Sequence, residues 1–143
     1  MSDKPLRIRT AEWLGWVEQE RETFPWYKDE SRIVTAITYA RGDYRGIAYL
    51  VDGDKTEWEH CWDMPDYPRD LGACAEVLEA IEARHKESGW YLSIAYAYLD
   101  PGYTVTIWAA REIANYKGRL GHATAPTLPE ALCEAFCRAV EGE

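Results

Sequence analysis

Two stretches of alternating side chains near the C-terminal end constrain the fold of this chain most strongly. Residues 90–99 read WYLSIAYAYL and residues 103–110 read YTVTIWAA. In both stretches every second residue belongs to the same face, which is the period of a β-strand with one side against a core. The turn sequence Asp100–Pro101–Gly102 joins them. We therefore expect an antiparallel hairpin.

Other stretches carry strand or helix signals of their own. β-branched and aromatic residues predict further strands at 32–40, 46–51, 57–62 and 116–123. Apolar residues at every third or fourth position predict three helices: one after Thr10 with Trp13, Leu14, Trp16 and Val17 as its buried stripe, one from Asp70 to Gly89, and one from Thr127 to Val140. This mixture predicts the α+β class, with an antiparallel sheet covered by helices, and 143 residues suit a single domain.

The last predicted helix contains Cys133 and Cys137, one helical turn apart. Two thiolates at this spacing can meet one metal ion, but a site needs further soft ligands. None of the remaining cysteines and histidines stands at a ligand spacing from this pair. We therefore interpret both thiols as core residues and expect no metal and no cofactor. Thr127 and Glu130 read as a capping box at the start of the same helix.

Negative charge is concentrated in the middle of the chain. The net charge is -9, and residues 51–82 hold ten acidic residues against two basic ones. Such a segment repels nucleic acids and attracts a basic protein surface. Interleaved aromatic residues would serve as anchors. We therefore predict a partner-binding surface with these residues: Glu57, Trp58, Glu59, Trp62, Asp63, Asp66 and Tyr67.

Two other kinds of site stay open at this point. Arg41, Tyr44 and Arg45, in the predicted turn at 41–46, have the chemistry to hold a nucleotide, because arginine pairs with phosphate and aromatic rings stack on bases. His60, Cys61 and Asp63 could offer mixed ligands for a small metal-assisted hydrolase, although we expect no enzyme.

No apolar run approaches a membrane-spanning length, and the first ten residues contain no apolar signal segment. We therefore expect no contact with membranes and a cytoplasmic protein with reduced thiols.

Two segments resemble the phage ABA-sandwich domain family. In residues 65–90 the matching positions are Pro65, Tyr67, Asp70, Leu71, Ala73, Glu76 and Val77. Residues 123–140, ATAPTLPEALCEAFCRAV, are similar to the closing helix of that family. Pro68–Arg69 stands where the family has Ser-Thr before the capping aspartate. The resemblance covers about residues 65–140 and leaves 1–60 as an N-terminal elaboration with a helix and a β-hairpin.

The resemblance implies a phage or prophage gene and an α-β-α sandwich-like fold, and it implies no catalytic residue. Our leading hypothesis is a non-enzymatic accessory protein in the host cytosol that inhibits a host defence factor through an acidic, nucleic-acid-mimicking face. The alternatives are a sponge for a nucleotide messenger of host immunity and a phage structural or assembly protein. Exposed tryptophans would favour a homodimer.

Overall fold

The computed structural model describes residues 4–27, 29–51, 57–97, 102–109 and 119–142. Antiparallel strands and helices together confirm the α+β class. The elements within these residues are α1 (Leu6–Trp13), β1 (Val17–Trp26), β2 (Asp29–Arg41), β3 (Tyr44–Val51), β4 (Glu57–Trp62), α2 (Ala75–Ser88), β5 (Trp90–Ala97), β6 (Gly102–Ala109), β7 (Arg119–Ala125) and α3 (Leu128–Glu141). The chain divides into two compact units, Met1–Met64 and Pro65–Glu143. That it folds as a single domain stays a prediction.

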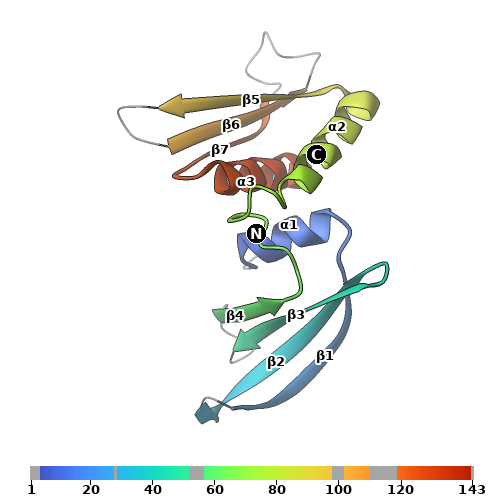
Figure 1. The fold of residues 1–143 in the computed structure, drawn as a ribbon, viewed down its shortest axis with the longest axis vertical. Helices are drawn as coiled ribbons and strands as arrows, with labels where there is room; N and C mark the ends of the chain where they lie inside the picture. Colours follow the sequence, from blue (N-terminus) through green and yellow to red (C-terminus); the bar gives the residue numbers. More distant parts are fainter. Residues whose placement is uncertain (1–3, 28, 52–56, 98–101, 110–118, 143) are drawn as a thin grey trace. The chain divides into compact units, whose positions relative to one another are not determined.

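The N-terminal unit is built on a four-stranded antiparallel sheet in the order β1-β2-β3-β4. Its first two strands form a long curved hairpin (Figure 1). A two-residue loop joins β2 to β3, with Arg41 paired to Tyr44. Gly42 has φ 62, which glycine adopts without strain, so the predicted turn is confirmed. The predicted strands around it are confirmed as parts of β2 and β3, and the predicted edge strand is β4.

The helix predicted after Thr10 is wrong in its extent. α1 ends at Trp13, and Gly15 then adopts φ 101, a left-handed conformation that stops a helix. The residues from Val17 to Glu22, predicted to continue the helix, instead belong to β1, which pairs with β2. The local spacing of apolar residues suggested a helical stripe, but pairing with a distant strand decided the structure.

The C-terminal unit is a three-stranded antiparallel sheet in the order β5-β6-β7, with α2 and α3 packed against it (Figure 1). The predicted hairpin is confirmed as β5 and β6, whose eight residue pairs run without a shift. α3 approaches β7 so closely that a Cβ on Gly121 would lie 2.8 Å from the Ala139 nitrogen. This contact identifies the face of the sheet that α3 covers.

The ends of the two long helices are set by different devices. α2 begins at Ala75, and the Asp70 carboxylate caps the preceding turn by accepting the N–H of Gly72 at 2.9 Å. α2 stops at Gly89, as predicted, because that glycine has φ 72. Thr127 occupies the N-cap position of α3 but makes no side-chain capping hydrogen bond, so the predicted capping box is wrong. In the described residues no helix is long and apolar enough to cross a bilayer.

Candidate functional site

The predicted acidic surface is divided between the two units, because the boundary between them lies at Met64 and Pro65. Four of its residues belong to β4, whose side chains lie outside the described part of the structure; they are Glu57, Trp58, Glu59 and Trp62. Asp63 is exposed with φ 62, and Asp66 is half-buried. A single acidic docking face therefore stays a prediction.

Tyr67, the remaining predicted anchor, is not on the surface. Its side chain is fully buried, and its hydroxyl donates a hydrogen bond of 2.6 Å to Glu76 Oε2. Its carbonyl oxygen lies 3.0 Å from the Cys74 sulfur, which donates to it. The prediction that Tyr67 contacts a partner is wrong, because a buried ring is not available for docking.

The predicted nucleotide site in the first hairpin turn is not assembled. The Arg41 guanidinium lies 5.1 Å from the Trp16 ring and donates to the Leu14 carbonyl at 3.4 Å. Arg45 donates to the carbonyls of its own turn, at 2.9 Å from Gly42 O and 3.0 Å from Tyr44 O. Tyr44 is 70% exposed. Both guanidinium groups contact the protein itself here, so the three side chains do not converge, and nucleotide binding at this turn stays a prediction.

The predicted core thiols are buried. Cys74, Cys133 and Cys137 are all inaccessible to solvent, and the Cys74 and Cys133 sulfurs lie 3.9 Å apart. The hydrogen bond with Cys133 lowers the pKa of the Cys74 thiol, against the opposing effects of burial and of the Asp70 carboxylate. In the described part of the chain no three potential ligands gather around a metal position. The thiol of Cys61 lies outside that part.

The junction between α2 and β5 is fixed by contacts to Trp90. His85 Nδ1 donates to the Trp90 carbonyl at 2.8 Å, and the Arg84 guanidinium lies 5.4 Å from the buried indole ring. The imidazole ring also meets Tyr91 edge-on, with centroids 5.0 Å apart. These contacts follow directly from the Gly89 stop, which turns the chain back along the helix. They hold the start of β5 against the end of α2.

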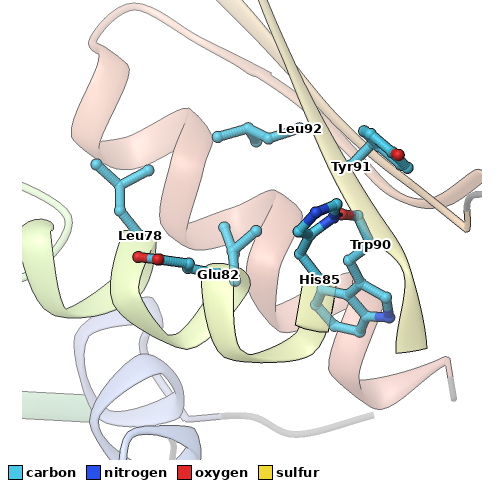
Figure 2. Close-up of a pocket in the computed structure, with 7 residues that line it drawn as sticks. Leu78, Glu82, His85, Trp90, Tyr91 and Leu92 are labelled. Carbon is cyan, nitrogen blue, oxygen red and sulfur yellow. Dashed lines mark hydrogen bonds between the residues drawn. The ribbon is translucent and has the colours of Figure 1, made fainter. Parts of the chain in front are cut away.

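A groove of about 370 Å³ opens between α2 and β5 (Figure 2). Leu78 from α2 and Leu92 from β5 point into it, with Glu82 on its rim (Figure 2). The other residues that line it are Ile81, His85, Trp90 and Tyr91. Its surface is mainly apolar, so it suits aliphatic or aromatic side chains.

Apolar side chains beyond the groove are about half exposed on the same strand, where the Tyr96 ring packs 5.1 Å from the Tyr103 ring. Ile94 is 47% exposed and Tyr96 48% exposed, although the pleat places them on the face that carries Leu92. On α2, Leu78 is 43% exposed, and Leu71 is exposed just before the helix. Both leucines recur at helical spacing with the buried Val77 and Ile81, yet they are exposed. The helix thus leaves an apolar margin along β5.

Sequence reasoning missed this groove, although one signal for it is present. Residues 90–97 contain no charged residue in a chain that holds 25 acidic and 16 basic ones. The alternation in this segment predicts a half-buried strand but carries no information about what covers its edge. An uncharged strand at the end of a sheet is a place where another chain can pair.

Comparison of the chain with protein-family models, with curated proteins and with solved structures finds no match. The resemblance of residues 65–140 to the phage ABA-sandwich domain family therefore stays a prediction.

Proposed function

We propose that the chain is a protein-binding module without catalytic activity, and that β5 together with the α2–β5 groove is its docking site. One observation carries the proposal. β5 is an outer strand of its sheet, it has no charged residue and no proline, and it pairs with β6 without any register shift. Natural sheets guard such edges with charges, prolines or bulges unless something pairs with them.

Among the strands that the structure describes, the other three outer ones each carry at least one of these guards. β1 contains three glutamates and Pro25, and its pairing with β2 is shifted at two places. β4 contains Glu57 and Glu59, and its pairing with β3 has one shift. β7 begins with Arg119 and has a shift opposite Ile107 and Trp108. β5 therefore differs from these three strands, because it has no charge, no proline and no register shift.

The mode of binding follows from the chemistry of this edge. The outer N–H and C=O groups of β5 would pair with an extended segment of the partner, which adds a strand to the sheet. Alternate side chains of that segment would face the groove and the uncovered Ile94 and Tyr96. Backbone pairing supplies affinity, and the apolar groove selects which side chains fit.

The charges beside the groove indicate what flanks this apolar segment. Glu82 lies on the rim and is exposed, as is Glu79 one turn earlier. The Lys86 ammonium lies 3.5 Å from Glu82 Oε1, an exposed pair that binding can displace at little cost. A lysine or arginine next to the apolar residues of the partner would therefore be favoured. This supports a partner with basic character, as predicted from the acidic composition.

The biological setting is part of the proposal. A phage or prophage accessory protein that inhibits a host factor in the host cytosol would need a surface of this kind. Strand addition also fits a structural or assembly role, so the identity of the bound protein separates the two. An apolar docking strand differs from the acidic mimic of nucleic acid that the composition predicted.

Photo-crosslinking tests the site directly. The crosslinking residue p-benzoylphenylalanine is placed at position 96 in cells that produce the full chain, and in a matched control at position 44. Tyr96 lies on β5 and is 48% exposed, whereas Tyr44 is a more exposed tyrosine in the N-terminal unit. We expect one adduct of defined mass at position 96 and none at position 44. Its mass also shows whether the partner is a second copy or another protein.

The second part of the experiment introduces a charge on the docking strand. Ile94→Lys should abolish the adduct, and Ile33→Lys, at an isoleucine 54% exposed on β2, should leave it unchanged. An adduct that survives Ile94→Lys, equal labelling at both tyrosine positions, or the absence of any adduct at position 96 would each contradict the proposal.

A further inference from the structure

The sheet of the C-terminal unit has a second face, opposite the one that α3 covers. Residues on this open face follow from the strand register, because side chains alternate and directly paired residues share a face. They form three rows across β5, β6 and β7: Tyr91, Trp108 and Arg119; Ser93, Thr106 and His122; and Ala95, Thr104 and Thr124. Each row therefore carries side chains of a different chemical type, and successive rows are neighbours on the sheet.

The first row combines two aromatic rings with a guanidinium group. Tyr91 is exposed, Trp108 is half-buried and Arg119 is exposed. Aromatic side chains on an open sheet are platforms on which planar bases stack. Arginine pairs with phosphate oxygens through two parallel N–H donors. The row therefore matches the two ends of a nucleotide.

The second and third rows supply hydrogen-bonding groups, although Thr106 is only 7% exposed and therefore acts by holding His122. Thr106 Oγ1 lies 2.9 Å from His122 Nδ1, and Thr104 Oγ1 lies 3.0 Å from Thr124 Oγ1. The contact with Thr106 fixes the imidazole by its Nδ1 atom, so Nε2 is the ring nitrogen that would face a ligand. Hydroxyl groups and an imidazole of this kind suit the hydroxyls of a sugar.

Charge sets the class of ligand. β5, β6 and β7 contain no aspartate or glutamate, although the chain holds 25 acidic residues and has a net charge of -9. Their ionisable cationic side chains are Arg119 and His122, both on the open face. An anion meets no carboxylate from these strands, and this is complementary to a phosphate. A long nucleic acid would still be repelled by the net charge of the whole chain.

We infer that the open face binds a mononucleotide, with its base stacked on the Tyr91–Trp108 row and its phosphate on Arg119. The ligand class is the one predicted for Arg41, Tyr44 and Arg45, at a site that those residues do not share. This site shares Tyr91 with the docking groove, whereas Arg119 does not line that groove, so Arg119→Glu separates the two activities. Either activity can therefore fail without the other.

Titration of the full chain with AMP, ADP and ATP, followed by calorimetry and by NMR, tests the inference. Ribose 5-phosphate, inorganic phosphate and a short single-stranded oligonucleotide serve as probes of the separate parts. We expect saturable binding of at least one nucleotide. Arg119→Glu and Tyr91→Ala should each weaken it by roughly tenfold or more. Arg45→Glu and Tyr44→Ala, at the turn of the N-terminal unit, should leave it unchanged.

Four results would overturn the inference. They are no saturation by any nucleotide at millimolar concentration, inorganic phosphate that binds as tightly as the nucleotide, an oligonucleotide that binds more tightly than a mononucleotide, and binding that depends on Arg45 or Tyr44 instead of Arg119. Because Arg119 is exposed, the variant is expected to stay folded. An unchanged amide spectrum away from β7 would verify this, and Arg119→Lys gives a second variant that keeps the charge but loses the paired donors.

Discussion

The two sheets of this protein differ in the charge of their strands. The strands of the N-terminal sheet contain seven acidic residues, whereas those of the C-terminal sheet contain none. β1 is a charged and irregular edge, and β5 is an uncharged and regular one. The first sheet therefore has guarded outer strands, and the second has one unguarded outer strand, which is what the proposed docking at β5 requires.

The two sheets also differ in what holds them. α3 lies directly on β7, with Gly121 at the closest point, so the C-terminal sheet depends on a helix that touches its backbone. The N-terminal unit has a small apolar cluster of Trp26, Val34 and Val51, with Arg32 stacked 5.3 Å from the Trp26 ring. Within the described residues, the core of the C-terminal unit therefore lies on the α3 side of its sheet.

Gly121→Ala should have the largest effect, and only on the C-terminal unit. The added Cβ would collide with the Ala135 carbonyl oxygen and the Ala139 nitrogen, both in the backbone of α3. Forcing these elements apart should lower the free energy of unfolding by about 3 kcal/mol. Chemical denaturation followed by circular dichroism measures the change.

The matched control is Gly42→Ala in the N-terminal unit. No atom lies within 4 Å of a Cβ at that position, so the cost is only that of the left-handed φ of 62, about 1 kcal/mol. If Gly121→Ala proved no more costly than Gly42→Ala, close contact between α3 and β7 would not be what holds the C-terminal sheet.

The fold of the C-terminal half could be predicted from sequence because its signals are local. The two-residue period of 90–97 identified β5, and Gly89 identified the end of α2. β1 was missed because its glutamates show no apolar alternation and its structure depends on pairing with β2. Only the structure shows that Ile94 is uncovered, since this depends on the path of α2.

Two of the predicted site residues are placed differently from the prediction, for related physical reasons. Tyr67 is an aromatic residue among acids, and its sequence cannot show whether the ring points outward or into the protein. Arg45 is basic and sits in a turn, but a guanidinium group there also satisfies the carbonyls of its own turn. The open face was missed because its members come from three strands, and only the register brings them together.

Thr35→Val and Thr124→Val should lower the free energy of unfolding by small and similar amounts. They therefore test whether a threonine pair contributes equally in the two sheets. Each removes one hydroxyl pair across neighbouring strands, Thr23 with Thr35 at 3.2 Å and Thr104 with Thr124 at 3.0 Å. We expect each to lower the free energy of unfolding by about 0.2–1 kcal/mol. A clearly larger loss for one of them in denaturant titrations would show that the two sheets are not equally exposed at these pairs.

Arg21→Ala should have the smallest effect on stability and tests how the edge of β1 is guarded. Arg21 pairs with Glu18 on the same strand, and its hydrogen bond holds the pKa of the Glu18 carboxyl below its ordinary value of 4.5. A carboxylate with a lowered pKa in the folded state contributes stability above that value, and the contribution is lost as the pH falls through the folded pKa. Both side chains are substantially exposed, so solvent screens the pair and the change in the free energy of unfolding should be close to nothing.

NMR titration of the Glu18 carboxyl should show its pKa rising towards 4.5 in Arg21→Ala and unchanged in Arg45→Ala. The ionic guard on β1 should therefore weaken in acid, whereas β5 has no acidic or basic side chain that acid could titrate. If the pKa of Glu18 stayed low without Arg21, the guard would depend on some other group, and the contrast between the two edges would need a different physical cause.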